Sequence, residues 1–108
     1  MANTFKLKTK ANVGVTTSNV YVVPSATTTV VIGVTLANTS GSSITVGVGV
    51  TRASSDDVKL MKNVPIPQGS SFEFMGGNKI VLETTDILTV KSDVNNSLDV
   101  ALTIMEIT

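Results

Sequence analysis

Val and Thr together make up nearly a third of this 108-residue chain, and strong helix-forming residues are sparse. Both residues are branched at Cβ, which restricts rotation about χ1 and suits them to the pleated surface of a β-sheet. No part of the chain shows apolar residues at the i, i+3, i+4 and i+7 spacing of an amphipathic helix. The sequence therefore predicts an all-β protein.

Three stretches alternate apolar with polar or mixed residues at the two-residue period of a strand that has one face on the core. The sides expected to face the core are Val30, Ile32, Val34 and Leu36, then Ile44, Val46, Val48 and Val50, and finally Leu98, Val100, Leu102 and Ile104. This period predicts antiparallel sheets with one buried face.

Polar segments rich in Ser, Asn, Asp and Gly separate the strand-like stretches, and Pro24 ends one of them. The strands are expected near residues 5–10, 19–23, 28–38, 43–52, 57–62, 70–74, 79–83 together with 86–92, and 98–107. About eight short strands at this spacing predict an antiparallel β-sandwich, and a jelly roll is one form that the pattern allows. No linker divides the chain, so residues 1–108 are expected to form one domain, with residues 1–12 as an N-terminal arm or an edge strand.

The composition argues against several classes of function. The chain has a formal net charge of zero, so nothing favours nucleic acid, which usually selects a basic protein. It contains no Cys and no His, and its carboxylates are scattered, so we expect no disulfide, metal or cofactor. The N-terminus lacks the apolar region of a signal peptide, and the longest apolar run is too short to span a bilayer, so no membrane partner is expected.

The stretch "NVPIPQGSSFEFMGGNKIVLETTD", residues 63–86, is the one most suggestive of a catalytic motif. "IPQGSSFEF" resembles a turn and strand of cupins, but cupin metal sites depend on histidines that this chain lacks. "FMGGNK" has no Gly-Lys-Ser sequence or following helix, so it is expected to be a tight turn at Gly76–Gly77 instead of a phosphate loop. With no Ser nucleophile motif either, the chain is not expected to be an enzyme.

Two groups of residues are candidates for contacts with other subunits. Gly47 and Gly49 share one face of a strand, where they indicate a close sheet approach or bulge, or else a flat face for a neighbouring backbone. Phe5 begins a strand in which Lys6, Lys8 and Lys10 share one face. Those lysines either protect an edge strand from uncontrolled pairing or form a docking face for an acidic partner.

A carbohydrate-binding or receptor-binding module is the alternative function for a small β-sandwich. Sugar platforms usually present exposed aromatic rings, and this chain has no Trp. The candidate rings are Tyr21, Phe72 and Phe74, of which the two phenylalanines are also candidates for core or interface positions.

The segments "VYVVPSATTTVVIGVTLANTSGSSITVGVGV", "LMKNVPIPQGSSFEFMGGNKIVLETTDILTVKS" and "NNSLDVALTIMEIT" cover most of the chain. Together with the opening "MANTFKLKTKA", they resemble small virion structural proteins of tailed bacteriophages, in particular those of marine contractile-tailed cyanophages. The resemblance implies a head decoration, neck or tail accessory protein that forms homo-oligomers and docks on other virion proteins. It also implies assembly in the cytoplasm of a host bacterium and a final location in the virion. Only 15% of the residues are charged, which suits self-association because a neutral surface is cheaply desolvated.

Overall fold

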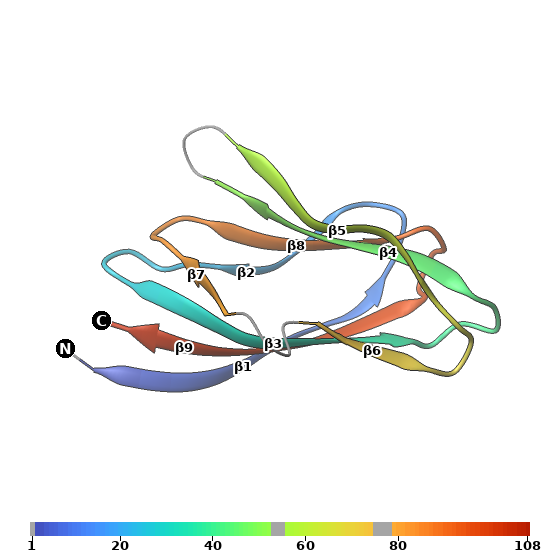
Figure 1. Ribbon diagram of the computed structural model, residues 1–108, viewed down its shortest axis with the longest axis horizontal. Helices are drawn as coiled ribbons and strands as arrows, with labels where there is room; N and C mark the ends of the chain where they lie inside the picture. Colours follow the sequence, from blue (N-terminus) through green and yellow to red (C-terminus); the bar gives the residue numbers. More distant parts are fainter. Residues whose placement is uncertain (1, 53–55, 75–78) are drawn as a thin grey trace.

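The computed structural model describes residues 2–52, 56–74 and 79–108, in which the chain forms nine strands and no helix. The strands are β1 (Asn3–Val13), β2 (Ser18–Val22), β3 (Thr28–Asn38), β4 (Ile44–Thr51), β5 (Asp57–Ile66), β6 (Ser71–Phe74), β7 (Ile80–Leu82), β8 (Ile87–Ser92) and β9 (Leu98–Ile107). Figure 1 shows them in two packed layers, with the β4–β5 hairpin extending beyond the rest of its layer. Among the described residues, no helix is long and apolar enough to cross a membrane.

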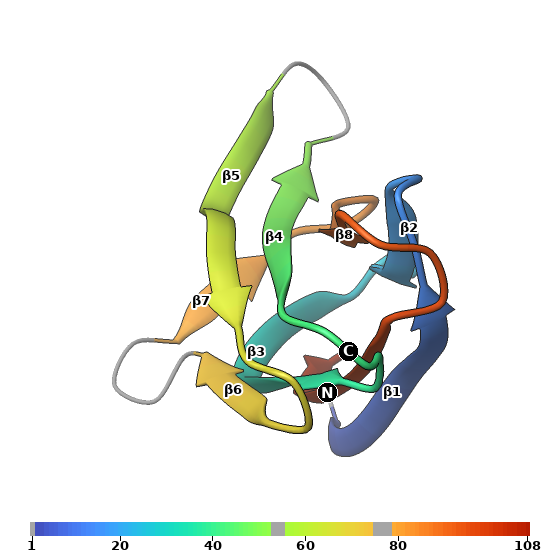
Figure 2. The same ribbon diagram turned by 90° about the vertical axis from the view of Figure 1, so that its right-hand side faces the viewer.

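The two layers are antiparallel sheets, which confirms the predicted β-sandwich. Sheet A has the order β1-β9-β3-β6, with β7 also paired to β3, and sheet B has the order β2-β8-β4-β5. β6 pairs with residues 34–37 of β3 and β7 with residues 29–31, so the two form one interrupted edge strand. The result is eight strand positions in two four-stranded sheets, connected as in a jelly roll (Figure 2).

The apolar sides of β4 and β9 face the core as predicted. All eight of their predicted core residues are buried, and Leu98, Leu102 and Ile104 have no exposed surface. The core is completed by residues from the other strands and their connections, the largest being Leu36, Ile66, Leu82 and Leu88. Removal of these aliphatic side chains from water is the main contribution to folding.

The prediction for β3 was right for Val34 and Leu36 and wrong for Val30 and Ile32. Pairing of β3 with β9 shifts register between Val31 and Gly33, which is the signature of a β-bulge. The bulge moves the buried face onto Val31, which is only 1% exposed, while Val30 and Ile32 are half-buried. Val30 lies opposite Met105 and therefore shares its outer face of sheet A.

Residues 79–83 and 86–92 do not continue one another as strands. β7 lies in sheet A and β8 in sheet B, and a tight turn from Glu83 to Asp86 carries the chain between the sheets. In this turn Thr85 has a φ of +73°, and the Asp86 carboxylate accepts a hydrogen bond of 2.9 Å from the Glu83 N–H. The turn interrupts the apolar pattern because it changes sheets, whereas the sequence suggested a break within one strand.

The N-terminal residues form an edge strand of sheet A. β1 pairs antiparallel with β9 from Asn3 to Val13, with a register shift after Lys10. Backbone hydrogen bonds of 3.0 Å in both directions between Ala2 and Thr108 extend this ladder to the chain ends, which lie side by side in Figure 1. No strand among the described residues pairs with the outer edge of β1.

Candidate interaction surfaces

A buried polar network closes the sandwich between β1, β2 and β9. The Glu106 carboxylate accepts a hydrogen bond of 2.5 Å from the Tyr21 hydroxyl and lies 2.8 Å from the Lys6 ammonium. Tyr21 also shares a hydrogen bond of 2.8 Å with the Thr29 hydroxyl, and the Lys8 ammonium lies 5.9 Å from the centre of its ring. Lys6 and Lys8 therefore pack across the open side of the sandwich, which was not among the roles expected for them. We refer to Lys6, Tyr21, Thr29 and Glu106 as the Glu106 network.

The network shifts the pKa values of both its acidic groups. Hydrogen bonds from Lys6 and then Tyr21 lower the pKa of Glu106, because they stabilise its charged form. Burial, followed by the hydrogen bond to the Glu106 carboxylate, raises the pKa of Tyr21 to about 12. The charged Glu106 carboxylate contacts Lys6 of β1 and Tyr21 of β2, so we expect the network to hold these two strands together.

Titration of Tyr21 tests this network directly, because it is the single tyrosine and the chain has no Trp. In the folded protein we expect phenolate absorbance to appear with a midpoint near pH 12, compared with about 10 in the unfolded chain. Since the folded pKa is the higher one, this group stabilises the fold fully below pH 10 and loses that contribution as the pH rises to about 12. In Glu106→Gln the midpoint should fall, and a wild-type midpoint near 10 would contradict the network.

An apolar row crosses the outer face of sheet A. Phe5 of β1 lies opposite Met105 of β9, Met105 opposite Val30 of β3, and Val30 opposite Val81 of β7. Directly opposed residues of an antiparallel pair share a face, so these four side chains line up across the sheet. The exposed fractions are 70% for Phe5 and 58% for Val81, while Met105 and Val30 are half-buried. We call these four residues the apolar row.

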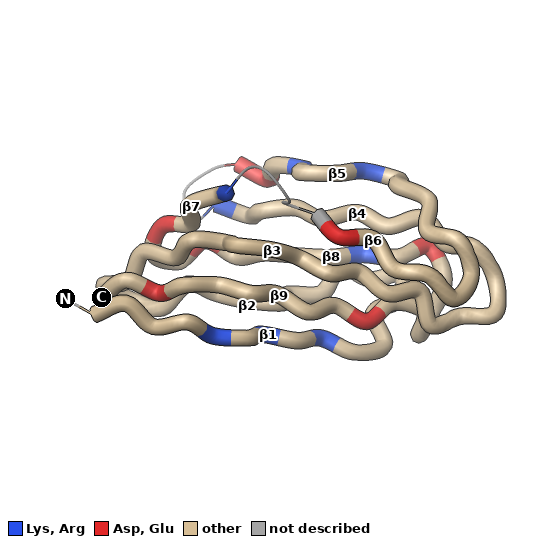
Figure 3. Tube along the Cα trace, turned by 60° about the horizontal axis from the view of Figure 1, so that its bottom comes forward, with Lys and Arg blue, Asp and Glu red and all other residues tan. Residues whose placement is uncertain are grey.

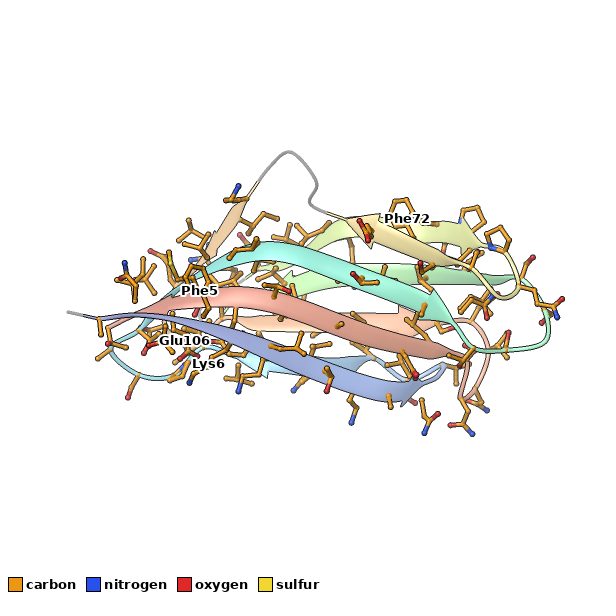
Figure 4. All side chains as sticks on the ribbon, turned by 90° about the horizontal axis from the view of Figure 1, so that it is seen from below. Phe5, Lys6, Phe72 and Glu106 are labelled. Atoms are coloured by element: carbon orange, nitrogen blue, oxygen red, sulfur yellow. The ribbon has the colours of Figure 1, made fainter. Side chains whose placement is uncertain are left out.

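Leu7, which is 64% exposed, lies beside the apolar row on the same face. Figure 4 shows Phe5, Lys6 and Glu106 gathered at one end of sheet A, with Phe72 toward the other end. Of these residues the sequence singled out Phe5, Lys6 and Phe72. It missed Met105 and Val81 because nothing in a strand's own pattern shows which residues of other strands lie opposite it.

Gly47 and Gly49 lie beneath a hollow on the outer face of sheet B. A Cβ atom at Gly49 would lie 2.9 Å from the carbonyl oxygen of Val58, and one at Gly47 would lie 3.4 Å from that of Met61. The β4–β5 ladder shifts register twice at this point, which brings the β5 backbone close to both glycines. The close backbone approach and irregular ladder account for the glycines, and the surface above them is concave instead of flat.

The hollow has a volume of about 340 Å³. Its charged lining residues are Lys59, Lys62, Lys91 and Asp93. The Asp93 carboxylate already accepts a 2.9 Å hydrogen bond from the Thr45 N–H. The hollow therefore has a basic rim and a backbone floor, and no group in it is arranged for acid–base or nucleophilic catalysis.

The two glycines should differ in their tolerance of a methyl group. Gly49→Ala is expected to lower the free energy of unfolding by about 1 to 2 kcal/mol, because its Cβ would overlap a backbone oxygen. Gly47→Ala should change the free energy of unfolding by less than about 0.5 kcal/mol. The new Cβ would lie in tight but possible contact with the Met61 carbonyl oxygen, and the loss of conformational freedom in the unfolded chain would offset that strain. Urea unfolding followed by circular dichroism measures both, and equal losses would contradict the proposed contact with Val58.

Of the three aromatic rings considered for a sugar platform, the structure describes the side chains of Tyr21 and Phe72. Tyr21 is only 5% exposed and its hydroxyl is used within the Glu106 network, so its ring is not available to a ligand. Phe72 is 37% exposed at the β6 edge of sheet A. The Phe74 side chain and the turn expected at Gly76–Gly77 lie outside the described part of the structure. Nor do the described residues contain a group of three carboxylates that could hold a metal ion.

The comparisons with known proteins bear on the fold. No protein-family model matches the chain, and no curated protein matches it. The chain is similar to a solved structure described as "Bacillus endospore appendages form a novel family of disulfide-linked pili". The TM-score is 0.59 over 99% of this chain and 87% of the other, at 10% sequence identity. Since identity is so low, the similarity shows a shared β-sandwich fold.

Proposed function

We propose that this chain is a non-enzymatic structural subunit of a tailed-phage virion. It acts as a head decoration, neck or tail accessory protein, through homo-oligomeric assembly and docking on other virion proteins. The observation that carries this proposal is the apolar row, which leaves Phe5 and Val81 more than half exposed on a regular sheet face. Contiguous exposed apolar surface of this kind typically marks a protein–protein interface.

Two further observations support an assembly role. The sequence resembles small virion proteins of contractile-tailed phages over most of its length. The structure shares its fold with a protein of endospore appendages that are described as disulfide-linked pili. This chain has no Cys, so its copies cannot be joined by disulfide bonds.

Quantitative mass spectrometry of purified particles of the encoding phage tests the proposal. A copy number close to that of the major capsid protein would identify a decoration protein that braces the shell. A small copy number would place the chain in the neck or tail. Its absence from particles would overturn the virion assignment and return attention to the receptor-binding or carbohydrate-binding alternative.

A further inference from the structure

We propose that a second copy of this chain packs on the outer face of sheet A, apolar row against apolar row, about a two-fold axis. This inference rests on the proposed function and names the partner and geometry of its first assembly step. The outer edge of β1 stays unpaired in this contact. The proposal follows from the absence of charge along β1, β9 and β3 of the face, from the size of the exposed apolar surface, and from the lysines of β1.

At the end of sheet A that carries the apolar row, the described residues of β1, β9 and β3 place no ionisable side chain on the outer face. Three successive rows of opposed residues run across it: Asn3–Ile107–Thr28, then Phe5–Met105–Val30–Val81, then Leu7–Thr103–Gly33. Charged residues lie at the β6–β7 edge of the sheet, where Lys79 and Glu83 flank Val81 and the next row ends in Glu73. Figure 3 shows the charged residues of sheet A on β1, beside both ends of β7 and at separate points of β9 and β6.

The absence of charge along β1, β9 and β3 of this face favours a second copy as its partner. In a two-fold contact each patch meets itself, so any charge near the axis would meet a like charge. These three rows avoid that cost, because their side chains are apolar or neutral. A charged partner would find no complementary group on them and would lose hydration without compensation.

The exposed apolar surface is large enough to form the centre of such a contact. Phe5, Leu7 and Val81 are 70%, 64% and 58% exposed, which leaves on the order of 300 Å² of apolar side chain in water. A stable interface buries about 800 Å² per partner, with an apolar centre and a polar rim. The apolar row and Leu7 supply the centre, and the exposed Asn3, Thr28 and Thr103 supply the rim.

Pairing through the β1 edge is disfavoured by the same strand. Lys6, Lys8 and Lys10 lie on the inner face of β1, opposite Ile104, Leu102 and Val100 of β9. If two β1 strands paired antiparallel around Lys8, each of these lysines would lie opposite a lysine of the other copy. Like charges directly opposed across strands destabilise the pair, and edge lysines are a known protection against such pairing. The edge of β1 is therefore a poorer surface for self-association than the face beside it.

Analytical ultracentrifugation over a range of concentrations tests the proposal with two charge variants. Phe5→Glu places a carboxylate at the centre of the contact and should weaken dimerisation at least 100-fold. The matched control is Val22→Glu, since Val22 is 50% exposed at the β2 edge of the other sheet, and its dimerisation constant should equal that of the wild type. Circular dichroism melting of both variants checks that each remains folded. A dimer that survives in folded Phe5→Glu overturns this inference and leaves the proposed function standing.

Single-cysteine crosslinking separates the face from the edge, because the natural chain has no Cys. With a short bismaleimide reagent, Leu7→Cys should crosslink between copies and Lys8→Cys should not. Crosslinking of Lys8→Cys in preference to Leu7→Cys would show edge pairing and overturn the face contact. A wild-type protein that sediments as a monomer at every concentration overturns the self-association, whereas its detection in virions would still support the structural role.

Discussion

Replacing Asn38 by Asp is expected to lower the free energy of unfolding by about 3 to 5 kcal/mol at pH 7. Asn38 ends β3 and is only 4% exposed. Its amide group donates to three carbonyl oxygens, those of Ser42 at 2.8 Å, Ile66 at 2.9 Å and Pro67 at 3.2 Å. Its own oxygen accepts hydrogen bonds of 2.9 Å from the N–H and hydroxyl of Ser40. One side chain thereby ties the β3–β4 turn to the end of β5.

The substitution keeps the shape and removes both donors. The new carboxylate would face three carbonyl oxygens in a buried position, so its charged form would be destabilised and its pKa raised. A raised folded pKa means that the lost stability is recovered as the pH falls, because the protonated carboxyl can again donate one hydrogen bond. Wild type and variant should therefore differ most at neutral pH and converge in acid.

Urea unfolding followed by circular dichroism at pH 7 and pH 4 measures this effect as a difference between the two proteins. Asn19→Asp on the exposed part of β2 is the matched control, and it should change the free energy of unfolding by less than about 0.5 kcal/mol. If Asn38→Asp is as stable as the control at pH 7, the Asn38 side chain does not make these buried contacts.

The sequence predicted best those features that depend on one strand alone. In β4 and β9 an unbroken two-residue period identified every buried aliphatic side chain, because alternation specifies which residues share a face, although it did not identify the buried Glu106. In β3 the same reasoning failed at Val30 and Ile32, because a bulge is a property of two paired strands and leaves no mark in the pattern of one. Alternation also says nothing of sheet membership, so the break between β7 and β8 could not be read as a change of sheet.

The interaction surfaces were predictable only in part, for the same reason. Phe5 and the β1 lysines could be singled out, since an alternating basic and apolar strand near a terminus suggests an edge. Tyr21 was a candidate for the alternative sugar platform, whereas its hydroxyl is hydrogen-bonded to Glu106, which lies 85 positions away in the chain. The row through Met105, Val30 and Val81 exists only once three strands have found their register. Pairings between residues so far apart in the sequence can be identified only from the folded structure.

Asp86→Ala should lower the free energy of unfolding by about 2 to 3 kcal/mol, because Asp86 holds the turn that moves the chain from sheet A to sheet B. Its side chain is 4% exposed and accepts hydrogen bonds of 2.9 Å from both the Glu83 N–H and the Arg52 Nε–H. Hydrogen bonding to Asp86, and to a lesser extent its negative charge, raises the pKa of Arg52. Alanine would leave the Glu83 N–H without its acceptor and Arg52 paired with Glu83 alone.

A second pair of substitutions separates the contribution of the turn hydrogen bond to stability from that of the ion pair. Arg52→Gln removes the cation and leaves the turn hydrogen bond, so it should destabilise the protein much less than Asp86→Ala, because exposed ion pairs contribute little to stability. Asp57→Ala removes an exposed carboxylate from the start of β5 and should leave the stability unchanged within about 0.5 kcal/mol. Urea unfolding of the three variants should therefore rank Asp86→Ala well below the other two. If Arg52→Gln is as damaging as Asp86→Ala, the ion pair and not the hydrogen bond to Glu83 holds the sheet-to-sheet turn.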